Sequence, residues 1–189
     1  MITSTEYIQL KAFARQDGVF LGLIWVVAFA CFIGSMTDSS LQLGFMIGLL
    51  STPFVVYYML RHYRDKVLDG SISFYRAFAF ISLTMVYASM IMAAATFVYF
   101  HFLDNGTFFG TLMANIKLPE VQQAFTDAGI KYEELEEQMT IMSQSRPIDF
   151  AFSVFTEGIF VALAHGALIG LLGRKKPVSP GKNRNITQA

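Results

Sequence analysis

The sequence predicts an all-α fold: an integral membrane four-helix bundle with short amphipathic helices in the extracytoplasmic connection between helices three and four. Hydrophobic residues make up 54% of the chain and charged residues only 15%, whereas soluble domains carry about 25% charged residues. The apolar residues gather in four runs, each close to the roughly 20 residues needed to cross about 30 Å of hydrocarbon. The cations gather on one side of these runs, as the topology of membrane proteins requires.

The four runs place the spans at residues 18–36, 41–60, 77–103 and 150–173. The first three contain no Asp, Glu, Lys or Arg. The first run is longer than the apolar core of a signal peptide, and no small-residue cleavage site follows it, so we expect it to be retained. Residues 1–173 are therefore predicted to form a single membrane domain.

The distribution of Lys and Arg predicts the orientation in a cell inner (plasma) membrane. Eleven lie in the N-terminal segment, the connection 61–76 and the C-terminal tail, against three in the two opposite connections. Since cations concentrate on the cytoplasmic side, both termini are expected there. The basic tail, residues 174–189, is rich in proline, glycine and polar residues and is predicted to be disordered.

The extracytoplasmic connection, residues 104–147, contains patterns of three short helices. The first has an apolar stripe within residues 108–116, Pro119 opens the second and Gly129 closes it, and the third spans about 132–142. These helices either lie on the outer membrane surface or fold over the bundle. The acidic run EELEEQ indicates a solvated face, because it lacks the alternating ligands of a calcium loop.

The connection between helices two and three reads HYRDKVLDGSISFYRAF, residues 62–78. It resembles a family of bacterial multi-pass membrane proteins known only as domain of unknown function 4199, and the four-span layout extends the resemblance over most of the chain. The resemblance implies no established activity, cofactor or catalytic residue. The residues that carry it are Tyr63, Arg64, Asp65, Lys66, Gly70, Ile72, Ser73, Phe74, Ala77 and Phe78.

The same hairpin has a physical interpretation, in which Arg64, Asp65, Gly70 and Ser73 are its candidate residues. Gly70 permits a tight turn, and Ser71 or Ser73 can cap helix three. Arg64 and its basic neighbours are expected at the level of the lipid headgroups, where they fix the topology. Alternatively, the hairpin is a docking surface for a cytoplasmic partner or an anionic lipid.

Two ionisable residues, Glu157 and His165, lie inside the fourth run. They are eight residues apart, or about 12 Å along a helix, so they cannot bond each other. An adjacent row of small residues predicts a helix-packing seam that the polar pair flanks. The row consists of Gly158, Ala162, Gly166 and Gly170.

Three interpretations of the polar pair remain open. Glu157 can act as packing glue, bonded to a hydroxyl of helix three or two. It can instead form a proton or cation path with His165, or contact another protein. The hydroxyl candidates are Ser82, Thr84, Ser89 and Thr96 on helix three and Ser51 and Thr52 on helix two.

The remaining chemistry-bearing residues form no recognisable catalytic, metal or cofactor motif. Cys31 is the only cysteine, and a net charge of zero indicates no nucleic-acid partner. We therefore expect a non-enzymatic structural, interaction or accessory component; the alternative is a small proton- or ion-coupled transporter or channel subunit using Glu157 and His165. Beyond the lipid bilayer, the expected partner is another membrane protein or a second copy, since helices one and two also carry small-residue faces.

Overall fold

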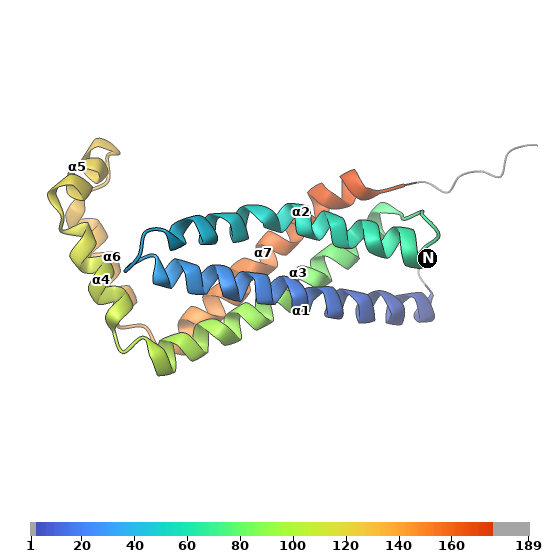
Figure 1. The fold of residues 1–189 in the computed structure, drawn as a ribbon, viewed down its shortest axis with the longest axis horizontal. Helices are drawn as coiled ribbons and strands as arrows, with labels where there is room; N and C mark the ends of the chain where they lie inside the picture. Colours follow the sequence, from blue (N-terminus) through green and yellow to red (C-terminus); the bar gives the residue numbers. More distant parts are fainter. Residues whose placement is uncertain (1–2, 176–189) are drawn as a thin grey trace, which may run out of the picture.

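The computed structural model describes residues 3–175, which fold as an all-α membrane bundle (Figure 1). This confirms the expected fold class, because four of the helices are long and apolar enough to cross a membrane. The elements are α1 (Ser4–Gly34), α2 (Leu41–Val67), α3 (Phe74–Val98), the π-helical segment η1 (Tyr99–Leu103), α4 (Thr107–Ile116), α5 (Pro119–Asp127), α6 (Tyr132–Ser143) and α7 (Pro147–Gly173).

The long helices extend beyond their apolar runs. α1 begins at Ser4 because Thr3 and Glu6 form a capping box, in which the Glu6 carboxylate accepts from the Thr3 N–H at 2.9 Å. α2 continues to Val67, and the chain turns at Gly70, whose φ of +82° favours glycine. Hydropathy marks only the hydrocarbon-embedded part of a helix, whereas backbone hydrogen bonding continues until a cap or turn ends it.

The four long helices pack in the order α2, α1, α3, α7, with α3 between α1 and α7. Glycines permit the close approaches: Gly18 and Gly22 face α3, while Gly44 and Gly48 of α2 face α1. α2 meets α7 where Gly173 lies against Leu60. Figure 1 shows α2 and α7 diverging from this end, and the two helices make few contacts with each other.

The three helices predicted in the connection 104–147 are confirmed as α4, α5 and α6. They contact one another and project to one side at the end of the bundle away from the N-terminus (Figure 1). Aromatic contacts join them to the spans, including Phe32 with Phe108 and Phe109 with Phe150, at centroid distances of 6.1 and 5.5 Å. The three helices do not run along the spanning helices (Figure 1).

The two described residues beyond α7, Arg174 and Lys175, lie beside the connection between α2 and α3. The backbone N–H of Ile72 donates to the carbonyl of Lys175 at 2.9 Å, and the N–H of Lys175 donates to the carbonyl of Ile72 at 3.0 Å. This antiparallel pair holds the end of α7 beside the start of α3. Most of the predicted disordered tail, residues 176–189, lies outside the described residues.

Candidate functional site

The row of small residues on α7 faces α3. A side-chain carbon at Gly158 would overlap Ser89, and one at Gly166 would lie 2.5 Å from the Ser82 hydroxyl. Ala162 is fully buried between them, and Gly170 lies against the start of α3. Because this face is committed to α3, the neighbouring side chains of α7 are directed to the edges of the contact.

A lateral cleft of about 440 Å³ lies beside this contact, between α2 and α7. Its walls are mostly apolar, and Glu157 and His165 both line it. The structure thus places the two ionisable residues in one cavity, although it does not join them by a hydrogen bond. The other lining residues are Trp25, Ala28, Phe29, Phe45, Leu49, Thr52, Met92, Val154, Gly158 and Val161.

Glu157 is exposed in the isolated chain, and its carboxylate makes no hydrogen bond or ion pair within residues 3–175. None of the candidate hydroxyls bonds Glu157 in the structure. Thr84, Ser89 and Thr96 donate to carbonyls one turn earlier in α3, and Ser82 donates to the carbonyl of Ala162. Ser51 and Thr52 donate likewise to the Gly48 carbonyl of α2. A serine or threonine side chain in a helix readily donates to the backbone carbonyl three or four residues earlier in the same helix.

His165 is oriented by its own helix. Its Nδ1 lies 2.9 Å from the carbonyl oxygen of Val161. A carbonyl oxygen only accepts, so Nδ1 carries the hydrogen in this contact. The other ring nitrogen, Nε2, is then available at the cleft as an acceptor when the ring is neutral and as a donor when it is protonated.

Trp25 of α1 and Thr52 of α2 link two of the helices that line the cleft. The indole Nε1 of Trp25 donates to the Thr52 hydroxyl at 3.0 Å. Thr52 is buried, so the bond fixes α1 against α2 within the hydrophobic region. The Trp25 indole and the Thr52 hydroxyl therefore have hydrogen-bond partners, whereas the Glu157 carboxylate on α7 has none within residues 3–175.

Thr52→Val tests this contact, because it keeps the side-chain shape and removes the acceptor. We expect the free energy of unfolding to fall by about 1 kcal/mol, since the indole N–H loses its partner. Trp25 is the only tryptophan, and its fluorescence should shift to shorter wavelength. Ser51→Ala is the control, because that hydroxyl donates within α2. An unchanged Trp25 spectrum in Thr52→Val would contradict the hydrogen bond.

The candidate hairpin residues adopt structural roles. Ser73, rather than Ser71, caps α3 by accepting from the Arg76 N–H at 3.4 Å. Arg64 is buried, so its side chain faces the protein. Its guanidinium donates to the Gly173 carbonyl at 3.1 Å and forms two bonds with Asp65, at 2.7 and 3.0 Å. It thereby satisfies a free carbonyl at the end of α7.

Sequence reasoning missed a second ion pair, which joins the start of α3 to the start of α1. Arg76 of α3 contacts the Glu6 carboxylate of α1 at 3.1 Å, next to the buried Tyr63, which stacks on Phe80 with ring centroids 4.4 Å apart. The partners are 70 residues apart, and no local pattern could have paired them. Within residues 3–175 no group of three His, Cys, Asp or Glu residues is placed to hold a metal ion.

Comparison with known proteins gives a family. No curated protein and no solved structure matches the chain. The profile of one family, described as "Protein of unknown function (DUF4199)", matches residues 16–175. The match includes α2, α3 and α7 and most of α1, and with them the cleft and the hairpin. The chain therefore belongs to this family of proteins of unknown function.

Proposed function

We propose that the protein is a non-catalytic interaction or accessory component of the inner membrane, and that its cleft receives one face of a transmembrane helix from another membrane protein. One observation carries this proposal: the open cleft between α2 and α7 presents Glu157 without a partner among residues 3–175. Exposed to lipid, an ionised carboxylate costs roughly 3 kcal/mol. A partner helix with a hydroxyl, amide or basic side chain would remove that cost.

The orientation belongs to the same proposal. The end of α2, the start of α3 and the end of α7 lie at the end of the bundle that carries the N-terminus (Figure 1). Arg61, Arg76 and Arg174 belong to these segments. This end holds most of the chain's cations, so we assign it to the cytoplasm. α4, α5 and α6 then lie on the opposite side of the membrane.

The glycine faces favour a different protein over a second copy as the occupant. Gly18 and Gly22 already contact α3, and Gly44 and Gly48 already contact α1. These four glycines, of the kind that commonly drives self-association of membrane helices, are thus already covered by neighbouring helices of the same chain. The cleft between α2 and α7 is a recessed and mostly apolar surface, and Glu157 adds a carboxylate to it.

A proton- or ion-coupled transporter or channel subunit is the second candidate, because Glu157 and His165 line the same cleft. A path across the membrane needs a series of polar stations. Thr52 and Trp25, the other polar side chains of the cleft, are bonded to each other, which favours the interaction role.

Photo-crosslinking from both walls of the cleft tests the proposal. A crosslinking amino acid replaces Leu49 on α2 or Val161 on α7, which are 53% and 42% exposed. The matched controls are Leu50 and Leu163, which are 61% and 47% exposed and lie outside the cleft. We expect both cleft positions, and neither control, to capture the same hydrophobic helix of another protein, as mapped by mass spectrometry of the linked peptides.

Glu157→Gln separates the two candidate functions. An interaction role predicts that the crosslinks from Leu49 and Val161 weaken while purified protein in liposomes shows no proton or cation flux before or after the substitution. A flux that Glu157→Gln abolishes in the folded protein would support transport instead. Crosslinks to a second copy of this chain, or to lipid alone, would overturn the proposed partner.

A further inference from the structure

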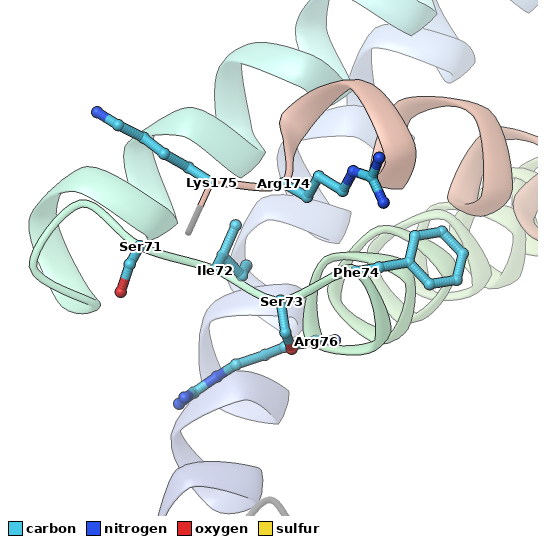
Figure 2. A pocket seen from close by; sticks show the side chains of 7 residues that line it. All are labelled: Ser71, Ile72, Ser73, Phe74, Arg76, Arg174 and Lys175. Atoms are coloured by element: carbon cyan, nitrogen blue, oxygen red, sulfur yellow. Dashed lines mark hydrogen bonds between the residues drawn. The ribbon is translucent and has the colours of Figure 1, made fainter. Parts of the chain in front are cut away.

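A second cavity lies at the end of the bundle that we propose to be cytoplasmic. It has a volume of about 620 Å³ and lies where α7 ends and α3 begins (Figure 2). The antiparallel pair of Ile72 and Lys175 holds its two sides together. Its lining residues are Ser71, Ile72, Ser73, Phe74, Arg76, Arg174 and Lys175.

The lining is cationic and has no carboxylate. Arg76 pairs with Glu6, but within residues 3–175 neither Arg174 nor Lys175 has an ion-pair partner. The sequence of residues 176–189 contains no Asp or Glu that could supply one. Arg174 and Lys175 therefore lie at the cavity without an ion-pair partner, between the positive end of the α3 dipole and the negative end of the α7 dipole. Asp65, the acidic side chain whose charge interacts with Lys175, lies outside the lining.

The cationic side chains form a rim and not a closed cage. Figure 2 shows Arg174 extending beside Phe74, Lys175 leaving on the other side, and Arg76 turning toward α1. Ile72 and Phe74 add apolar surface to the same cavity. Long cations beside a partly apolar cavity suit an amphiphile whose charged group lies at the membrane surface, because their stems cover apolar surface while their charged ends stay in the polar layer.

We propose that this cavity binds the phosphate headgroup of an anionic phospholipid from the adjoining leaflet. The spanning helices α3 and α7 begin and end here, so the cavity lies at headgroup depth. The Arg174 and Lys175 side chains and the Ser71 and Ser73 hydroxyls supply donors. This site goes beyond the proposed helix-docking function and does not depend on it.

Native mass spectrometry of the purified full chain with phosphatidylglycerol or phosphatidylcholine tests the proposal. The variant Arg174→Gln/Lys175→Gln leaves the Ile72–Lys175 pairing intact, because that pairing uses backbone atoms. The control Arg61→Gln/Lys66→Gln removes two exposed cations from the same end, outside this cavity. We expect the first variant to bind phosphatidylglycerol about tenfold to thirtyfold more weakly, and the control to bind it as the unchanged protein does.

Three outcomes would overturn the proposal. Equal losses in the two double variants would show attraction by bulk charge and no defined site. Equal retention of phosphatidylcholine and phosphatidylglycerol by the unchanged protein would remove the requirement for an anionic headgroup, and this measurement needs no variant to fold. Displacement of the lipid by millimolar inorganic phosphate would assign the cavity to free phosphate.

Discussion

Gly18→Ala is expected to lower the free energy of unfolding by about 1–3 kcal/mol, the cost of overpacking a tight contact. The added methyl carbon would lie 2.6 Å from the Cβ of Tyr87 and 2.7 Å from the carbonyl oxygen of Thr84. A backbone carbonyl cannot rotate out of the way, so α1 and α3 must separate. Denaturant unfolding in mixed micelles, followed by circular dichroism, measures the loss.

Gly110→Ala is the matched control for this prediction. Gly110 lies in α4, and a methyl carbon there would meet nothing within 4 Å. Alanine is a better helix former than glycine by about 1 kcal/mol, so this change should be neutral or stabilising. If Gly18→Ala is also neutral or stabilising, α1 and α3 are not as close as the structure shows.

Arg64→Ala is expected to cost about 2–3 kcal/mol of unfolding free energy, because hydrogen bonds to charged groups are among the stronger ones. The change leaves the Gly173 carbonyl at the end of α7 without its donor and separates Asp65 from its ion-pair partner. It also empties volume between α2 and α7. Thermal unfolding of the purified protein in one detergent measures the change.

Arg61→Ala provides the comparison, since Arg61 is exposed and lies one turn earlier on α2. We expect its effect to stay within about 0.5 kcal/mol. Arg64→Lys should fall between the two, because an ammonium keeps the charge but cannot form both bonds to Asp65. Equal stabilities of Arg64→Ala and Arg61→Ala would show that Arg64 does not hold α7.

The two proposed sites can be tested independently because they lie at different depths. Glu157 lies 10 residues into α7, or about 15 Å along it, whereas Arg174 and Lys175 follow its last residue. Glu157→Gln should therefore leave lipid retention unchanged, and Arg174→Gln/Lys175→Gln should leave crosslinks from Leu49 and Val161 unchanged. Failure of one proposal does not affect the other.

The sequence by itself determined the parts of the structure that depend on local chemistry. Four apolar runs placed the spanning helices, Pro119 and Gly129 bounded α5, and Ser73 was one of two hydroxyls named as the cap of α3. Hydropathy, helix capping and turn formation depend on residues close together in the chain. They can therefore be deduced without knowing what packs against each helix.

Only the tertiary structure decided which side of each helix is covered. It turned Arg64 inward to Gly173, left Glu157 in an open cleft, and joined Ile72 to Lys175. In a membrane, lipid is as apolar as a helix face, so hydropathy does not set the rotation of a helix about its axis. Close packing of small residues against neighbours sets it, and those neighbours are distant in sequence.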